Sequence, residues 1–339
     1  MSRAWYLPLE DDRAWNDALE GVPHSYAHTR SYCHAMHLTT GYDSYLFVYE
    51  RDGLRVVCPF AERTYEGFTD IVSPGGISGF TGAAGCPEVQ ELWAAFVRDR
   101  GYVCGYIAQN PHFEDPSHFP ARHAASSNSL YHLDLTEGVE KLYDCVDRNR
   151  KRQLRAWKQS GEELIHDRLA LKDFIVEHHA AFMRSVGASP SNFLSRPSLG
   201  ALCDDDRVLL VGAGEGGRIK SVYAFGYTDH LGDCLISISL PEGRRWVTPL
   251  LWWGIETLAA LGVPRLNLGG GVREGDAIAQ AKQRFGAHRK PFRVLREVYR
   301  PDVYEQLCRR AGKDSESRAG FFPPYRAPGA SAASASNAS

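Results

Sequence analysis

Short apolar runs alternate with amphipathic helical segments in both halves of the chain, and this order limits the possible folds more than any other feature. In the first half, apolar runs at residues 45–50, 54–63 and 102–109 are typical of strands. The segment PEVQELWAAFVRDRG precedes the third run and has apolar residues at helical spacing, with Gly101 where a C-cap belongs. This alternation predicts an α/β domain.

The second half repeats the alternation. Helices are predicted at residues 169–185 and 248–262, and strands at 207–214, 219–228, 234–240 and 265–270. With 339 residues the chain is longer than one average domain, so we expect two. The expected ranges are 1–137 for the first domain, 138–312 for the second, and 313–339 for a disordered tail rich in Ser, Ala, Pro and Gly.

Three glycines in the second half, Gly212, Gly214 and Gly217, have the G-x-G-x-x-G spacing of a dinucleotide-binding turn. That kind of site needs a helix after the glycines, whereas residues 218–228 are β-branched and aromatic in alternation. We therefore predict a β-hairpin at this place.

Composition narrows the function classes. The sequence is 43% hydrophobic and 24% charged, and it contains neither a secretory signal nor an apolar run near the ~20 residues of a membrane helix. Its eight cysteines and 13 histidines show no zinc-binding spacing. The formal net charge of −2 argues against a general nucleic-acid coat. We expect a cytoplasmic monomer with no membrane span, no metal, no bound cofactor and no DNA partner.

Residues 139–161 have the apolar spacing of one long helix that ends at Gly161. Its second part carries six basic residues and no acidic one: Arg148, Arg150, Lys151, Arg152, Arg155 and Lys158. At 3.6 residues per turn, Arg148, Arg152 and Arg155 share one face, and Lys151 and Lys158 share a neighbouring face with Arg155. The stripe predicts phosphate binding, and the alternative is a solvated face whose charges pair with other elements.

The run LNLGGG at residues 266–271 ends an apolar strand in three glycines. No GK[ST] follows, so the lysine and the metal-binding hydroxyl of a P-loop are missing. We expect the glycines to permit a close backbone approach where the strand leaves the sheet. They would then position the segment AKQRFG at residues 281–286.

Three segments together, RNRKRQLRAWKQSG, PLLWWGIETLAALGVPRLNLGGG and AKQRFGAHRKPF, resemble the Fem family of aminoacyl-tRNA-dependent peptidyltransferases. The resemblance covers roughly residues 20–300. It implies an α/β fold of two tandem GNAT-like domains, with mixed sheets flanked by helices and a basic helix that joins them. Family members move an amino acid from its tRNA ester to an amine. By resemblance the second domain holds the aminoacyl donor, and a cleft between the domains holds the acceptor amine.

The family's FKxxFG motif corresponds to AKQRFG, with Ala281 in place of the usual Phe. The resemblance therefore assigns Lys282 to catalysis, as the cation that stabilises the oxyanion formed when an amine attacks an ester. It also implies that Phe285 lies at the substrate, and that Arg148, Lys151, Arg152 and Arg155 bind phosphates of tRNA or acceptor.

Two departures from the family pattern concern the acceptor. The family's Asp-Pro corresponds to Asn110 and Pro111, and Asn110 is expected at the substrate although asparagine cannot act as a general base. Tyr32 and Met36 stand where the family has a Trp and a phosphate-binding Lys. This favours an acceptor other than the nucleotide-linked cell-wall precursor, such as a small peptide.

A second interpretation within the same fold is an acyl-CoA N-acyltransferase. Its Q/RxxGxG/A turn holds the CoA pyrophosphate, whereas the equivalent segment PEGRRWV has Gly243 alone. Arg244 and Arg245 in this segment are expected to bind a tRNA phosphate, or else to lie exposed in a turn.

The sequence thus predicts an aminoacyl-tRNA-dependent transferase that forms an amide bond. Its expected partners are a charged tRNA and a small peptide or peptidyl precursor of natural-product (antibiotic) or cell-wall biosynthesis. An acyl-CoA-dependent N-acyltransferase and a non-catalytic tRNA or peptide binder remain as alternatives.

Overall fold

The computed structural model describes residues 2–119, 124–271, 275–317 and 320–327, which fall into two compact units. The described residues of the first unit fall within 1–22, 42–126 and 293–339, and those of the second within 23–41 and 127–292. These ranges differ from the division expected at residues 137 and 312, because the chain passes from one unit to the other more than once.

The described residues of the first unit form a mainly antiparallel sheet with three α-helices. Helix α3 (Glu88–Asp99) fills the predicted range, and α1 (Asp12–Leu19) and α10 (Pro301–Arg310) accompany it. The strands follow in the order β1 (Ser2–Pro8), β2 (Ser44–Arg51), β3 (Leu54–Tyr65), β4 (Phe68–Val72), β6 (Cys104–Ala108) and the part of β12 (His288–Val298) that begins at Arg293, with β5 (Thr81–Gly82) on β3. The three strands predicted in the first half are β2, β3 and β6.

The core of the first unit is aromatic. Trp93 of α3 is buried and packs edge-on against Phe47 and Phe80, with ring centroids 5.1 Å apart in both pairs. Edge-to-face aromatic pairs of this kind stabilise a core beyond the area that they bury. They fix α3 on the sheet.

Residues 320–327 also belong to the first unit, although the sequence predicts disorder there. The buried carboxylate of Asp70 accepts hydrogen bonds from the Tyr325 hydroxyl at 2.9 Å and from Nε of Arg326 at 2.6 Å, while Arg63 donates to its other oxygen at 2.7 Å. Phe322 and Tyr325 are buried. The prediction of a disordered tail is therefore wrong for these residues, and residues 328–339 lie outside the described part of the chain.

The second unit contains a sheet that is covered on both faces. From the part of β12 that precedes Arg293, the strand order continues with β7 (Ala124–Asp134), β11 (Arg265–Gly270), β10 (Gly232–Ser239), β9 (Arg218–Tyr227) and β8 (Val208–Glu215). Alternate residues of β9 point to opposite faces: Tyr223 and Phe225 belong to one buried cluster, and Val222 and Ala224 to another. Both faces are therefore apolar, as the nearly continuous apolar runs of the sequence require.

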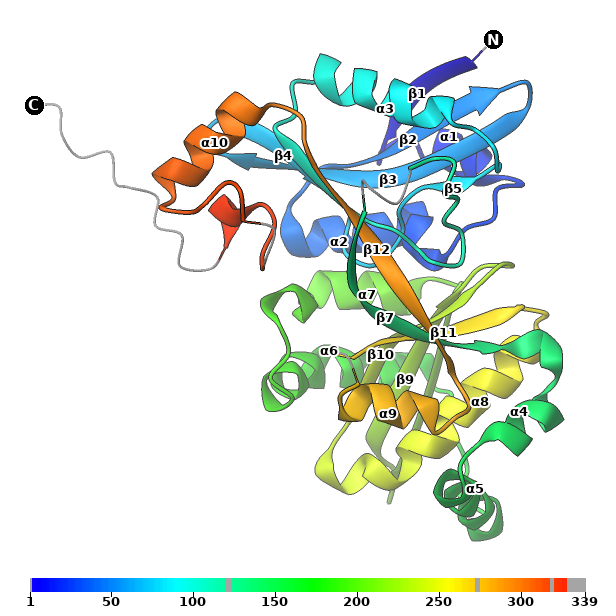
Figure 1. Cartoon of the computed structure of the whole chain (residues 1–339). Coiled ribbons are helices and arrows are strands. Elements are labelled where there is room, and N and C mark those ends of the chain that lie inside the picture. The colour runs from blue at the N-terminus through cyan, green and yellow to red at the C-terminus, as the bar shows by residue number, and fades with distance from the viewer. Residues whose placement is uncertain (1, 120–123, 272–274, 318–319, 328–339) are drawn as a thin grey trace, which may run out of the picture. The chain divides into compact units, whose positions relative to one another are not determined.

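Each face of this sheet has its own set of helices (Figure 1). Helices α4 (Val139–Cys145), α5 (Arg148–Ser160) and α8 (Val247–Ala260) cover one face. Helices α2 (Arg30–Thr40), α6 (Arg168–Ser185) and α7 (Arg196–Asp204) cover the other. The predicted strands and the helices at 169–185 and 248–262 are confirmed, and the additional helix α9 (Ala277–Gln283) follows β11.

The single helix predicted at residues 139–161 is wrong, because the chain breaks between α4 and α5. Val146 is extended, with ψ of 137°, and the Asp147 side chain accepts a hydrogen bond from the Arg150 N–H at 2.7 Å. An N-terminal cap of this kind starts a new helix. The basic stripe therefore belongs to a separate helix, α5.

The glycine-rich segment at 212–217 forms the predicted hairpin. Strands β8 and β9 pair in antiparallel register, and Gly216 and Gly217 have φ values of +58° and +74° in the turn that joins them. A strand and not a helix follows the glycines, so the dinucleotide-binding geometry is not formed.

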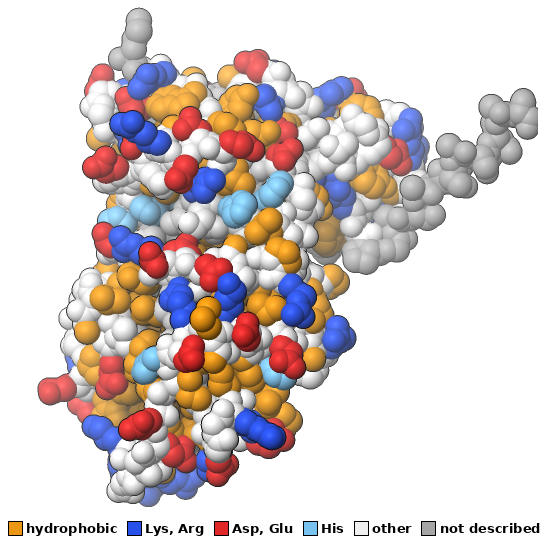
Figure 2. All heavy atoms as spheres, turned by 180° about the vertical axis from the view of Figure 1, so that it is seen from behind, with side chains coloured by type: hydrophobic (Ala, Val, Ile, Leu, Met, Phe, Trp, Pro, Cys, Tyr) orange, Lys and Arg blue, Asp and Glu red, His pale blue; other side chains and the backbone are white. Residues whose placement is uncertain are grey.

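Two observations concern the surface. Among the described residues, no helix combines the length and the apolar character that crossing a membrane requires. On the face shown in Figure 2, basic and acidic side chains are interspersed, in keeping with the formal net charge of −2.

Candidate functional site

Strands β10 and β11 of the second unit pair in parallel over a short stretch and then part. The pairs are Gly232 with Leu266 and Asp233 with Asn267, both at the start of β10. Just beyond these pairs the register of both strands becomes irregular. The register of β10 with β9 shifts between Cys234 and Ile236, and that of β11 with β7 shifts between Asn267 and Gly270. Such irregularities redirect a strand and release backbone groups from the ladder.

Lys282 of α9 lies where β10 and β11 separate. Its Nζ donates to the carbonyl oxygen of Gly270, at the end of β11, over 2.5 Å. Gly269 has φ of +78°, and a Cβ built on it would lie 3.3 Å from the same Nζ. The glycine run thus lets the backbone turn and leaves room for the ammonium, which is the role expected for it.

Helix α9 is fixed at both ends, and this fixes Lys282. The Asp276 side chain caps its start by accepting from the Ala279 N–H at 2.8 Å, and Ala279 is buried. At its end the Arg284 carbonyl accepts from the Asp147 N–H at 2.8 Å. Asp147 is also the cap of α5, so the segment of Lys282 and the start of the basic helix are joined.

The surroundings of Lys282 are poor in compensating charge. Burial lowers the pKa of its ammonium to about 8, although Cys234 and Asp276 act in the opposite direction. Burial also raises the pKa of the Cys234 thiol to about 12, which keeps that neighbour uncharged. An ammonium has three N–H donors, and within the described part of the chain Lys282 uses one, on Gly270. Two donors remain for an anionic oxygen.

A buried carboxylate supports the same turn from β10. Asp233 accepts a hydrogen bond from Nδ2 of Asn267 at 3.0 Å, and Asn267 accepts one from the Gly269 N–H at 2.9 Å. Burial raises the pKa of the Asp233 carboxyl to about 7. The pair fixes the glycine turn on which Lys282 depends. Sequence reasoning missed both residues, and the available signal was an acidic residue inside an apolar strand.

The basic residues of α5 divide into two groups. Arg148, Arg152, Arg155 and Lys158 are exposed, and three of them, Arg148, Arg155 and Lys158, make no hydrogen bond or ion pair with the described residues. Arg152 donates to Asn149 at 2.8 Å. From Arg148 to Lys158 this exposed set extends over about 15 Å at the rise of an α-helix.

The other basic residues of the helix are engaged in the structure. Arg150 is half-buried, donates to the Thr248 hydroxyl at 2.7 Å and lies over the Phe285 ring at 5.4 Å. Lys151 donates to the Asp144 carbonyl at 2.9 Å. Lys151, expected at a phosphate, therefore ties α5 to α4, so the alternative of charges paired within the protein holds for these two residues.

The remaining predicted residues are placed as follows. Phe285 is 3% exposed, so it supports α5 and α9 from below and is not available to a substrate. Arg245 pairs with Glu162 at 3.0 Å and lies over the Trp246 ring at 4.2 Å, whereas Arg244 is exposed and has no partner among the described residues. Only Arg244 of the pair is available to a phosphate.

Asn110 lies in the first unit and is buried. Its Nδ2 donates to the Ile77 carbonyl at 3.2 Å, and its Oδ1 accepts from the His112 N–H at 3.0 Å. Both ends of the amide thus hold the loop, which is the usual use of asparagine in a turn.

Tyr32 and Met36 lie in α2 of the second unit and are 8% and 5% exposed. Both side chains pack in the apolar cluster formed by α2, α6 and α7. Met36 is a core residue there, so its position offers no phosphate contact.

Comparison with known proteins was made for sequence and for structure. No family model and no curated protein matches the sequence. Among solved structures, FemX has a TM-score of 0.62 at 10% identity, over 90% of this chain and 99% of that chain. The chain has a Fem-like fold. The predicted α/β fold, similar to that of FemX, is confirmed.

Two further structures share this fold. A conserved protein of unknown function from Bacteroides thetaiotaomicron VPI-5482 has a TM-score of 0.57 at 9% identity, over 88% of this chain and 100% of that chain. L-PGS from Bacillus licheniformis has a TM-score of 0.51 at 11% identity, over 84% of this chain and 90% of that chain. At these identities the likeness concerns the fold, so the chemistry has to be argued from the site.

Proposed function

We propose that the protein transfers the aminoacyl group of a charged tRNA to an amine and so forms an amide bond. One observation carries the proposal: Lys282 holds a half-buried ammonium, with two N–H donors to spare, where β10 and β11 part. The reaction needs a cation at the ester carbonyl, because negative charge develops on that oxygen. The Fem-like fold supports this choice of reaction.

In the proposed reaction an unprotonated amine attacks the ester carbonyl carbon, and a C–N bond forms. The carbonyl oxygen becomes an oxyanion, which the remaining Lys282 donors stabilise. The tetrahedral intermediate then expels the ribose oxygen of the tRNA by breaking the C–O bond. The amine gives up one proton and the ribose oxygen takes one, so the products are an amide and uncharged tRNA.

The exposed face of α5 supports tRNA as the carrier of the acyl group. Arg148, Arg155 and Lys158 are exposed and unpaired within the described residues, and guanidinium and ammonium groups in such a row suit successive phosphates. We propose charged tRNA as the cosubstrate, without a further cofactor. For the acceptor we propose a small peptide or peptidyl precursor.

The segment PEGRRW does not favour CoA as the donor. It forms a short 3-10 helix, and a Cβ on Gly243 would lie 2.2 Å from the Lys220 carbonyl oxygen. This glycine therefore serves close packing against β9. A pyrophosphate-binding turn would instead need its backbone N–H groups directed at a ligand.

A donor comparison tests the proposal. The protein is incubated with a panel of small peptides and either charged tRNA or acetyl-CoA, each labelled on the transferred group. We expect labelled amide from charged tRNA alone, and its loss when the tRNA is digested beforehand. Transfer from acetyl-CoA would support an N-acyltransferase, and tRNA binding without any amide would support a non-catalytic binder.

A further inference from the structure

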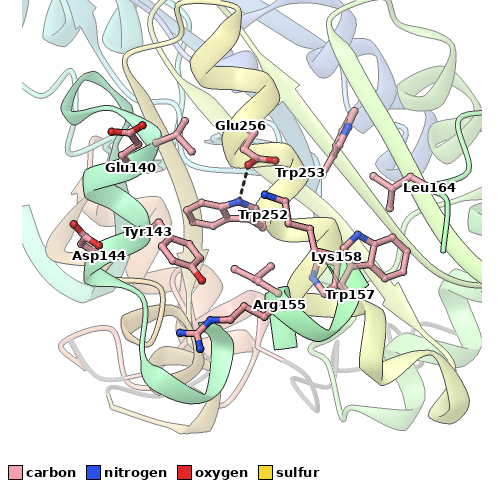
Figure 3. Close-up of a pocket in the computed structure, with 13 residues that line it drawn as sticks. Glu140, Tyr143, Asp144, Arg155, Trp157, Lys158, Leu164, Trp252, Trp253 and Glu256 are labelled. Carbon is pink, nitrogen blue, oxygen red and sulfur yellow. Dashed lines mark hydrogen bonds between the residues drawn. The ribbon is translucent and has the colours of Figure 1, made fainter. Parts of the chain in front are cut away.

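A pocket of about 600 Å³ opens between α4, α5 and α8 in the second unit. The chemistry proposed at Lys282 does not involve it, and it shares only Arg155 and Lys158 with the basic face of α5 described above. Its walls carry four aromatic side chains, Tyr143, Trp157, Trp252 and Trp253 (Figure 3). Trp252 lies at the centre and is 8% exposed, with the Tyr143 ring edge-on to it at 5.6 Å. Ligand pockets in proteins occupy about 300–1,000 Å³, so this one has room for a small aromatic group.

The basic and acidic residues of the pocket come from different helices. Arg155 and Lys158 come from α5, whereas the carboxylates come from α4 and α8: Glu140, Asp144 and Glu256. Glu256 accepts a hydrogen bond from the Trp252 indole at 2.8 Å through Oε1. In the view of Figure 3, the Trp252 ring lies between the Glu256 carboxylate and the Arg155 side chain. A ligand in this pocket therefore meets both carboxylate acceptors and cations around the Trp252 ring.

This distribution disfavours ligands of a single chemical kind. An organic cation in the aromatic recess would meet Arg155 and Lys158, and a plain anion would meet three carboxylates. An apolar side chain would use the aromatic rings and neither set of charges. A nucleotide can contact the aromatic rings, the basic side chains and the carboxylates of the pocket together. Its base stacks on aromatic rings, its phosphate binds basic side chains, and an exocyclic amine donates to a carboxylate.

We propose that this pocket binds one unpaired nucleotide of an RNA strand, and that it prefers bases with an exocyclic amine. The base would stack between the rings of Trp157 and Trp252, and its phosphate would lie on Arg155 and Lys158. The carboxylates of Glu256 and α4 would accept from the amine of cytosine or adenine, which uracil lacks. The identity of the RNA as tRNA rests on the proposed function, whereas the binding itself does not.

Binding of labelled tetranucleotides to the full chain tests the inference, with fluorescence anisotropy as the readout. We expect oligo-C and oligo-A to bind several times more tightly than oligo-U, and a blunt RNA hairpin to bind most weakly. Trp157→Leu should weaken oligo-C binding about tenfold. The matched control Trp5→Leu removes a half-buried tryptophan from the first unit and should leave binding unchanged.

A second variant keeps the test independent of the folding of Trp157→Leu. Glu256→Gln retains an oxygen that can accept from Trp252, and it should reduce the preference for oligo-C over oligo-U. Equal binding of the three oligonucleotides by the wild-type protein, or a hairpin that binds as tightly as they do, would overturn the inference. Selective binding without aminoacyl transfer would instead contradict the proposed function and leave the pocket as assigned.

Discussion

Lys282 combines three properties that an ordinary surface lysine lacks. It is half-buried, its Nζ donates to the Gly270 carbonyl, and its pKa is lowered by burial to about 8. A desolvated cation acts more strongly on a developing oxyanion than a cation in water, because the local dielectric constant is lower. The same burial lowers the pKa of the ammonium, because it disfavours the charged form.

The pKa of Lys282 predicts how activity depends on pH. Burial disfavours the charged form and lowers the pKa of Lys282 from the usual 10.5 to about 8, so the proton leaves in that range. Transfer to an amine that is already unprotonated at neutral pH should therefore be full below that range and fall as the pH rises through about 8. Initial rates across this range check it, after subtraction of spontaneous ester hydrolysis. A rate that stays constant to pH 10 would contradict it.

At the residue scale, a sequence pattern points to residue types and not to their environments. Lys282 is predicted because glycines and an FG pair flank it in a pattern, whereas Asp233 belongs to no motif, and its pairing with Asn267 on the next strand is seen only in the structure. Phe285 was predicted at a substrate and is buried. Burial depends on which elements pack together, and a local pattern does not contain that information.

At the scale of elements, the glycine turn after β11 is predicted to control Lys282. Gly269 and Gly262 both have left-handed backbones, with φ of +78° and +76°, but only a Cβ on Gly269 would approach Lys282, at 3.3 Å. Alanine at either position should lower the free energy of unfolding by about 1–2 kcal/mol. Only Gly269→Ala should also lower the transfer rate. Urea unfolding and single-turnover rates separate the two effects, and equal rates in both variants would contradict the role of the turn.

The basic helix allows a second prediction at this scale. Neutralising Arg148, Arg155 or Lys158 with glutamine should weaken tRNA binding, and each change should reduce the slope of log Kd against log salt by about 0.7–0.9. Arg150→Gln should leave that slope unchanged and lower stability, because Arg150 contacts Thr248 and Phe285. Filter binding at several salt concentrations checks this. A uniform slope change for all four variants would contradict the division into two groups.

Most helices and strands could be predicted from the sequence because their apolar residues repeat with the period of the element. The break between α4 and α5 could not be predicted, because Val146 continues the apolar spacing of a helix. The break depends on a single contact, in which the Asp147 side chain caps the start of α5. In α5, sequence also could not distinguish exposed arginines from Arg150, whose partner Thr248 is about 100 residues away.

At the scale of the whole molecule, the chain passes between two compact units more than once, and the sequence could not show this. Residues 23–41 pack in the second unit through contacts with α7, such as the Ser195 N–H donating to the Thr39 hydroxyl at 2.9 Å. Residues 320–327 join the first unit through the buried Asp70. Both associations depend on contacts that are distant in sequence, and composition alone predicts disorder for the second.

The Asp70 contact predicts a difference in stability between two arginines. Arg326→Gln leaves the buried Asp70 carboxylate with one guanidinium fewer and should cost about 2–3 kcal/mol. Arg310→Gln removes a pair with Glu66 in which the arginine is 49% exposed, and it should cost less than about 1 kcal/mol. Urea denaturation measures both, and similar losses would argue against integration of residues 320–327 into the first unit.

The central claim is that Lys282 stabilises the oxyanion of aminoacyl transfer. The most direct test is the single-turnover rate of amide formation from charged tRNA by the wild-type protein and by Lys282→Met, with tRNA affinity and unfolding measured in parallel. The account predicts a rate lower by about 10²–10³ at nearly unchanged affinity and fold. A variant that folds, binds tRNA and transfers at the wild-type rate would contradict it.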